Sequence, residues 1–225
     1  MGVKDSFSER KLKIDNLPIY ILTEEKKDGV LNYPVIKINY LSPSISFEGV
    51  DFLLFTSKNG VRAIDNITDE WKKIPAVVIG KATAQEVKKR GGKVEYIAKK
   101  AYGEELAKEI EKNFKNKTFL FLRAKKIVSD IKKEFKNNKL IEKIVYETIC
   151  NTPKNFLKKP AIVIFTSPST VECFAKVNDF ENIIPIAIGK KTKNELINHK
   201  VNSYLMPKNP SINECITLAK TLKFK

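Results

Sequence analysis

Two short hydroxyl-bearing segments contain the residues best suited to bind an anion. Each follows an apolar run, and they read Phe55-Thr-Ser-Lys-Asn-Gly-Val61 and Phe165-Thr-Ser-Pro-Ser-Thr-Val171. Threonine and serine at a strand end offer short neutral donors, and a helix that begins there adds main-chain N–H groups. This combination predicts binding of carboxylates.

A second pair of segments follows the first at nearly matched distance. These are Ile79-Gly-Lys-Ala-Thr83 and Ile188-Gly-Lys-Lys-Thr192, and a weaker echo places Glu105 and Glu214 equally far beyond the two glycines. The sequence therefore contains a duplicated supersecondary unit. Because threonine is a favoured helix cap, we expect Thr83 and Thr192 to begin helices.

The apolar runs that precede these turns are continuous rather than alternating. Such runs are typical of strands buried on both faces, and hence of parallel sheets flanked by helices. The sequence predicts strands at 19–22, 35–38, 52–55, 77–79, 118–122, 162–165 and 186–188, and helices at 83–89, 127–136 and 192–197. The segment 144–149 is expected to be extended, and 23–32 to contain no proper helix. The fold class is α/β with two similar domains.

The spacing of the repeat also suggests how the domains are assembled. The second copy has too few strands for a full sheet, so the N-terminal strands are expected to complete it. We expect residues 18–36 and 150–225 to form one domain and 40–144 the other, with 1–17 a poorly ordered extension. The linkers 36–39 and 145–149 are expected to pair as a two-stranded ladder. Ligands of parallel sheets bind beyond the carboxyl ends of the strands, so the turns should line a cleft between the domains.

The charge of the chain is strongly positive but does not indicate nucleic-acid binding. The net charge is +16, yet only four of the 42 basic residues are arginines, and the lysines are scattered. Base and phosphate recognition favours arginine, so we expect no nucleic-acid partner but attraction of an anionic substrate. No apolar stretch is long enough to span a bilayer and no secretory signal is present, so a cytoplasmic protein without membrane contact is expected.

Metal and nucleotide chemistry find little support in the sequence. Three widely spaced cysteines (Cys150, Cys173 and Cys215) and a single histidine, His199, make a zinc site or a disulfide framework improbable, so we expect reduced thiols. Neither a GxGxxG nor a GxxxxGK[ST] segment occurs. We expect no metal and no cofactor.

These motifs, in this order, resemble those of uroporphyrinogen-III synthases. The Phe-Thr-Ser and Ile-Gly-x-x-Thr pairs match signatures of that family, Leu120-Phe-Leu-Arg-Ala124 is similar to its L-x-L-R-[GA] turn, and Val145-Tyr-Glu-Thr148 to its VY-x-T segment. The resemblance covers about residues 19–220. The arginine usual after the first strand is missing, where this chain has Thr23 or Glu24.

The resemblance implies two α/β domains joined by a two-stranded ladder, and an enzyme that needs no cofactor. Such an enzyme closes linear hydroxymethylbilane, a polycarboxylate tetrapyrrole, to uroporphyrinogen III with inversion of the D ring and loss of water. The tyrosine implied to take part is Tyr146. The positions expected to bind substrate are Thr56, Ser57, Lys58, Asn59, Gly80, Lys81, Thr83, Arg123, Lys125, Thr166, Ser167, Ser169, Gly189, Lys190 and Thr192.

Other interpretations of the same residues stay open at this point. A non-catalytic two-domain protein that binds an anionic metabolite would share the same turns. Arg123 and Lys125 could bind carboxylates or be solvated loop charges, and Tyr146 could be a packing aromatic. Two small domains are compatible with a monomer.

Overall fold

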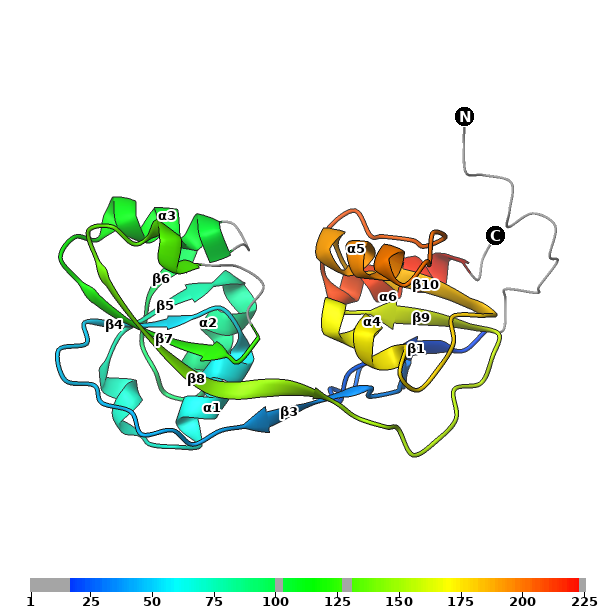
Figure 1. Cartoon of the computed structure of the whole chain (residues 1–225), viewed down its shortest axis with the longest axis horizontal. Helices are drawn as coiled ribbons and strands as arrows, with labels where there is room; N and C mark the ends of the chain where they lie inside the picture. Colours follow the sequence, from blue (N-terminus) through cyan, green and yellow to red (C-terminus); the bar gives the residue numbers. More distant parts are fainter. Residues whose placement is uncertain (1–16, 100–102, 127–130, 223–225) are drawn as a thin grey trace. The chain divides into compact units, whose positions relative to one another are not determined.

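The chain divides into two compact units, each with its own sheet. The structure is a computed structural model that describes residues 17–99, 103–126 and 131–222. One unit combines the chain up to Lys37 with the chain from Ile149 onward, and we name it the terminal unit. The other, the central unit, spans Ile38–Thr148 (Figure 1).

The sheet of the terminal unit has four strands, all parallel. Their order is β10-β9-β1-β2, so the two N-terminal strands complete the sheet of the second repeat copy. The strands are β1 (Ile19–Ile21), β2 (Leu31–Asn32), β9 (Ala161–Phe165) and β10 (Ile183–Ala187). Between β1 and β2 the chain forms turns and no helix, as predicted.

Helices cover both faces of this sheet. Side chains of α4 (Pro168–Phe174) and α5 (Lys190–Asn198) share one apolar cluster with Val163, whereas α6 (Ile212–Thr221) shares another with Ile164. Val163 and Ile164 are neighbours on β9, and both are fully buried. Because successive side chains of a strand point to opposite faces, burial on both sides requires the continuous apolar run seen in the sequence.

The sheet of the central unit has six strands in the order β3-β8-β7-β4-β5-β6. From β8 to β6 all neighbours are parallel. The Leu41 N–H donates to the Val145 carbonyl, and the Asn151 N–H donates to the Val35 carbonyl. Residue numbers therefore rise along one strand as they fall along its partner, so β3 and β8 are antiparallel. The strands are β3 (Ile36–Tyr40), β4 (Phe52–Phe55), β5 (Ala76–Ile79), β6 (Val94–Ala98), β7 (Thr118–Ala124) and β8 (Lys139–Cys150).

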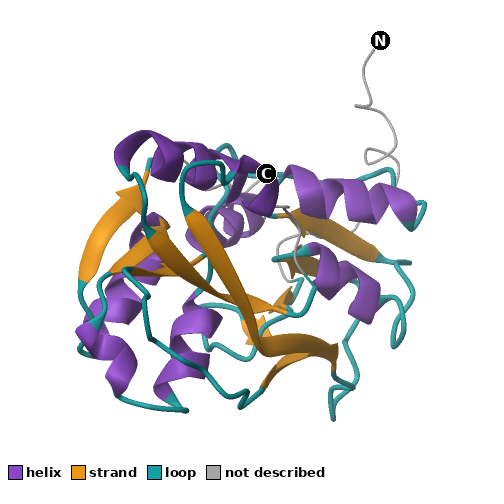
Figure 2. Cartoon of the chain, turned by 60° about the vertical axis from the view of Figure 1, so that its left-hand side comes forward, coloured by secondary structure: helices purple, strands orange, loops and turns teal. Residues whose placement is uncertain are grey.

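Helices again lie on both faces of the sheet, as the ribbons in Figure 2 show. The helices α1 (Lys58–Asp65) and α2 (Gly80–Lys89) share a cluster with Trp71 of the short 3-10 helix η2 (Glu70–Lys73). The opposite cluster contains side chains of α3 (Gly103–Asn113) and of the 3-10 helix η3 (Ile131–Glu134). The mixed α/β architecture with parallel sheets is therefore confirmed.

The starts of two helices differ from the prediction. α2 begins at Gly80 and α5 at Lys190, so Thr83 and Thr192 are not caps but buried residues of the first turns. The backbone explains α2, because Gly80 has φ +71 and turns the end of β5 directly into a helix. The prediction of a helix at 127–136 is wrong where it can be compared, since residues 131–134 form η3, while 127–130 lie outside the described residues, as do 1–16.

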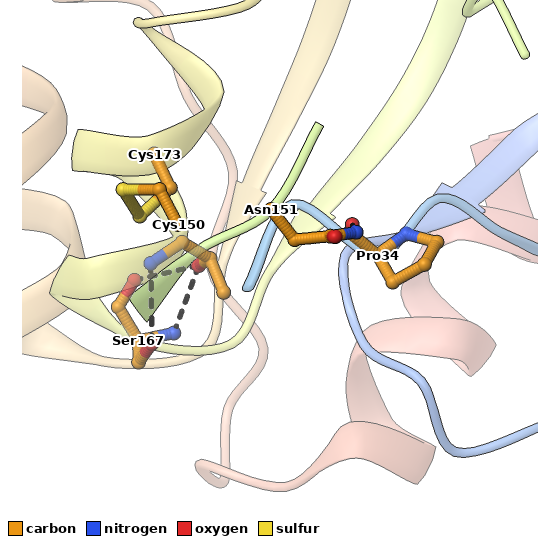
Figure 3. The surroundings of a disulfide bond; sticks show 6 residues. Pro34, Cys150, Asn151, Ser167 and Cys173 are labelled. Atoms are coloured by element: carbon orange, nitrogen blue, oxygen red, sulfur yellow. Dashed lines mark hydrogen bonds between the residues drawn. A yellow bond between two sulfur atoms is a disulfide. The ribbon is translucent and has the colours of Figure 1, made fainter. Parts of the chain in front are cut away.

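The expectation of reduced thiols is also wrong for two of the three cysteines. Cys150, the last residue of β8, forms a disulfide with Cys173 of α4 (Figure 3). Folding brings their Cα atoms to 5.2 Å, which a sequence separation of 23 residues could not reveal. Cys215 of α6 is free and buried.

Candidate functional site

The sequence-predicted residues gather at the carboxyl ends of the strands within each unit. In the central unit β4 leads through Thr56 and Ser57 into α1, and β5 leads directly into α2. We name 56–59 and 80–83 together the central rim. In the terminal unit β9 leads into α4 and β10 into α5, and 166–169 with 189–192 form the terminal rim.

In each rim one helix is capped by its own serine. The Ser57 Oγ accepts a hydrogen bond from the Asn59 N–H at 3.2 Å. The Ser167 Oγ accepts one from the Thr170 N–H at 3.3 Å, and the Ser167 N–H donates to Thr170 Oγ1 in return, which completes a capping box. These two serines therefore already satisfy main-chain groups of their own helices.

The other helix of each rim has no side-chain cap. The cap positions of α2 and α5 are Ile79 and Gly189, and neither supplies a side-chain acceptor. The first N–H groups of an uncapped helix attract anions, helped by the helix dipole. Exposed Lys81 and Lys190 stand in these first turns, and neither forms an ion pair with a carboxylate of the described chain.

The sequence predicted helix N-termini at both Gly-Lys turns, but it could not show that these helices lack side-chain caps. It drew attention to Thr83 and Thr192, whose hydroxyls would have capped the helices and competed with a ligand. Both threonines are instead almost fully buried, at 5% and 2% exposed. The anion-attracting groups are thus main-chain amides, together with the lysines that the sequence did identify.

Tyr146 lies on β8 in the central unit and contacts Ser57 of the central rim. Its side chain is 7% exposed and packs in the cluster beneath α1 and α2. The hydroxyl hydrogen-bonds to the Ser57 side chain. Burial, more than any neighbouring group, raises the pKa of the Tyr146 phenol above its usual value of 10.0. The phenol therefore keeps its proton at neutral pH and can donate a hydrogen bond.

Arg123 and Lys125, predicted to bind substrate, both have carboxylate partners. The Arg123 Nε lies 2.9 Å from Glu142 Oε1, at ion-pair distance but without hydrogen-bond alignment, and Nη1 donates to the Ala124 carbonyl at 2.9 Å. The Lys125 Nζ lies 3.0 Å from Glu147 Oε2. These contacts hold the end of β7 against β8, so the structural role has direct support.

Comparison with known proteins decides the family. The sequence profile described as uroporphyrinogen-III synthase HemD matches residues 21–217. The chain belongs to the uroporphyrinogen-III synthase family. A solved structure of uroporphyrinogen-III synthetase from Helicobacter pylori is similar at 26% identity with a TM-score of 0.74, and covers 92% of this chain and 100% of its own.

A more distant member shares the fold. A mutant uroporphyrinogen III synthase from Thermus thermophilus is 13% identical, with a TM-score of 0.56 over 92% of this chain and 98% of that one. No protein of curated function matches the chain. The sequence profile and the Helicobacter pylori structure confirm the resemblance to the uroporphyrinogen-III synthase family that the motifs indicated.

An acidic residue that the sequence analysis missed joins the two helices of the central rim. Glu86 of α2 accepts hydrogen bonds from Arg62 of α1 at 2.9 Å and from Arg90 at 2.8 Å. The Arg62 guanidinium, followed by Arg90, lowers the pKa of Glu86 to about 2 against the cost of burial. The i,i+4 spacing of Glu86 and Arg90 is visible in the sequence, but the link to Arg62 needs the fold.

The loop after β1 departs from the family pattern, and the structure supplies other cations there. The Asn32 Nδ2 clasps this loop by donating to the carbonyls of Thr23 and Glu25, each at 2.8 Å. An open depression of about 430 Å³ adjoins the loop and α6. It is lined by Lys26, Lys27, Asp28, Asn213, Ile216 and Thr217.

Proposed function

We infer that the chain closes hydroxymethylbilane to uroporphyrinogen III, with inversion of the D ring and loss of water, in haem biosynthesis. The observation that carries the site assignment is the pair of uncapped helix N-termini, at matching positions of the repeat and each beside an exposed lysine. Carboxylates are the groups that such helix ends attract, and the substrate carries many of them.

Each rim offers groups that bind carboxylates of the substrate. The main-chain amides at the start of α2 and α5 fix individual carboxylates, while Lys81 and Lys190 add attraction at longer range. The half-buried Thr56, Lys58, Asn59, Thr166 and Ser169 are further donors at the same turns. The net charge of +16 favours capture of the polyanion before it is oriented.

Tyr146 assists departure of the hydroxyl group. Its protonated phenol donates a hydrogen bond to the leaving oxygen, and the carbon–oxygen bond breaks with its electron pair on oxygen. That oxygen takes the phenol proton and leaves as water, and the proton that the substrate loses on ring closure restores the phenol. The Ser57 side chain holds the phenol in place at the start of α1. The carbon centre that remains closes on the D ring through a spiro intermediate, which inverts the ring.

The enzyme works without cofactor or metal, as a monomer in the cytoplasm, and without a nucleic-acid partner. The scattered lysines and the ion-paired arginines of the described chain support the last point, because bidentate phosphate recognition relies on free arginine. No helix in the described part is long and apolar enough to cross a membrane.

Incubation with freshly prepared hydroxymethylbilane tests this function. Separation of the product isomers should give uroporphyrinogen III well above the symmetrical isomer I, which forms spontaneously. A preparation that binds the tetrapyrrole but yields only isomer I would make the chain a binding protein and not the synthase.

Lys81→Gln and Lys190→Gln test the rims in the same assay. Each should raise KM, and the double variant should raise it further. Lys88→Gln is the matched control, because Lys88 is exposed near the other end of α2 and loses the same charge. If Lys88→Gln raised KM as much as the rim variants do, Lys81 and Lys190 would act only through the overall positive charge of the protein.

A further inference from the structure

The Cys150–Cys173 disulfide encloses a complete strand-to-helix unit of the terminal rim. Between the two cysteines lie β9, the Thr166–Ser167 turn and most of α4. Cys150 ends β8, and Cys173 is in the last turn of the helix that Ser167 caps. The bond therefore ties a strand end to the helix that begins in the rim, as Figure 3 shows beside the labelled Ser167.

The two cysteines of the disulfide differ in their exposure to solvent. Cys150 is exposed, whereas Cys173 is 3% exposed and shares an apolar cluster with Val171 and Phe174. A thiolate from solution therefore meets Cys150. Thiol–disulfide exchange depends on such access as well as on thiolate character.

The third cysteine is poorly placed to interfere. Cys215 is fully buried in the cluster on the opposite face of the terminal sheet, with Ile216 and Ala219. Burial raises the pKa of its thiol to about 11, so it carries almost no thiolate at neutral pH. Reshuffling within the chain is disfavoured, and the disulfide responds to external thiols.

Other contacts also anchor the segment between Cys150 and β9, including an ion pair of Lys159 with Asp179 and the buried side chain of Leu157. The Asn151 N–H donates to the Val35 carbonyl at 2.8 Å and its side chain to the Pro34 carbonyl at 2.6 Å, a contact visible in Figure 3. Further along, the Lys158 N–H donates to the Tyr20 hydroxyl at 3.2 Å, while Phe156 is 96% exposed. These contacts hold the segment at both ends, and the disulfide adds a covalent link to α4.

We propose that the Cys150–Cys173 disulfide is a redox-responsive clamp on the terminal rim, closed by oxidation and opened by a dithiol reductant, and that the closed form binds the tetrapyrrole more tightly. This inference rests on the proposed substrate role of the terminal rim. In the proposed cytoplasmic setting disulfides are rare, and those that occur are commonly catalytic or sense redox state.

The opening step follows ordinary exchange chemistry. One thiolate of the dithiol attacks Cys150 Sγ, the S–S bond breaks, and Cys173 leaves as a thiolate that takes up a proton. The second thiol of the reductant, as thiolate, then attacks the mixed disulfide and releases Cys150 as the second thiol. Two electrons and two protons pass to the protein, and the reductant becomes its own disulfide. Oxidation by a disulfide reverses each step.

A redox titration of the full chain tests the clamp. Wild type is equilibrated at set ratios of reduced to oxidised dithiothreitol, and three quantities are followed: alkylatable thiols by mass, the Kd for uroporphyrinogen III, and amide hydrogen exchange of residues 151–175. Two thiols should appear in one transition, with a several-fold rise in Kd and faster exchange over the same range.

Three variants make the result specific. Cys150→Ser and Cys173→Ser, each checked for folding by circular dichroism, should bind like the reduced wild type and ignore the redox buffer, while Cys215→Ala should respond like wild type. A Kd that is constant across the thiol transition, a response that persists in both serine variants, or three alkylatable thiols in the oxidised protein would overturn the clamp. Loss of isomer III formation in every redox state would instead refute the proposed function, and the Kd comparison would still decide the clamp.

Discussion

The hydroxyl of Tyr146 hydrogen-bonds to the side chain of Ser57, which also caps the first helix of the central unit. One serine thus positions both the phenol and the start of α1. The arrangement couples the residue proposed to act on the leaving group to a turn proposed to bind the substrate, and each can be tested separately.

Removal of the Tyr146 hydroxyl should affect turnover more than folding. In Tyr146→Phe the ring keeps its packing, and the loss of one hydrogen bond costs about 1 kcal/mol of unfolding free energy. We expect kcat to fall by about a hundredfold, the lower end of the usual range for loss of a positioned proton donor. Steady-state kinetics and thermal unfolding measure the two effects.

Tyr40→Phe is the control for this substitution, because Tyr40 is a nearby phenol that is 37% exposed. It should leave kcat close to the wild-type value. Full activity of Tyr146→Phe would remove Tyr146 from the mechanism and leave it as a packing residue.

The open helix end of α2 can be tested without a change of charge. Ala82→Pro removes one main-chain N–H from the first turn, where proline is tolerated because that N–H has no intrahelical partner. We expect a KM several-fold higher with an unfolding free energy within about 1 kcal/mol of wild type. Ala82→Ser, which keeps the N–H, serves as the control, and an unchanged KM in Ala82→Pro would exclude that amide from the site.

Acid should weaken the link between the helices of the central rim. Glu86 has a folded-state pKa of about 2 against an ordinary value of 4.5, so its contribution to stability is complete above pH 4.5 and is lost as the pH falls toward 2. Urea unfolding between pH 6 and about pH 2 should show this loss in wild type. In Glu86→Gln the protein should be less stable at pH 6 and should lose less on acidification.

Glu48→Gln, at an exposed position, is the comparison for that variant and should follow the wild-type pH profile. If Glu86→Gln and wild type had parallel profiles, the ion pairs with Arg62 and Arg90 would not contribute to stability in solution.

Gly60 should not tolerate a side chain. A Cβ at this position would lie 2.6 Å from the Leu122 carbonyl oxygen, so α1 would have to move away from β7. We expect Gly60→Ala to lower the unfolding free energy by about 1–3 kcal/mol, the usual cost of overpacking. Gly189→Ala is the matched control, since its added Cβ would meet Pro210 at an ordinary 3.6 Å. Equal stability of the two variants would contradict the close approach.

The sequence located the strands that are buried on both faces of a sheet, because such strands appear as continuous apolar runs. Val163 and Ile164 show why, because both are buried although they face opposite sides of β9. The duplicated apolar runs also located the strand ends at which the two rims lie. β6 was not predicted, since its side chains alternate between half-buried and exposed over most of its length.

What the sequence could not supply depends on backbone geometry and on contacts distant along the chain. Only a left-handed φ at Gly80 allows β5 to pass straight into α2, which moved Thr83 from the cap into the first turn. The pairing of Glu86 with Arg62 and the bond between Cys150 and Cys173 join segments whose proximity no local pattern encodes.

The binding of carboxylates by the two uncapped helix ends is tested most directly by amide chemical shifts. Uroporphyrinogen III is titrated under nitrogen into the isotope-labelled full chain, and the N–H signals of Lys81, Ala82, Lys190 and Lys191 are followed. We predict that signals from both helix ends shift as the ligand is added and that both sets reach saturation. Saturation that leaves either set of amides unmoved would contradict the account.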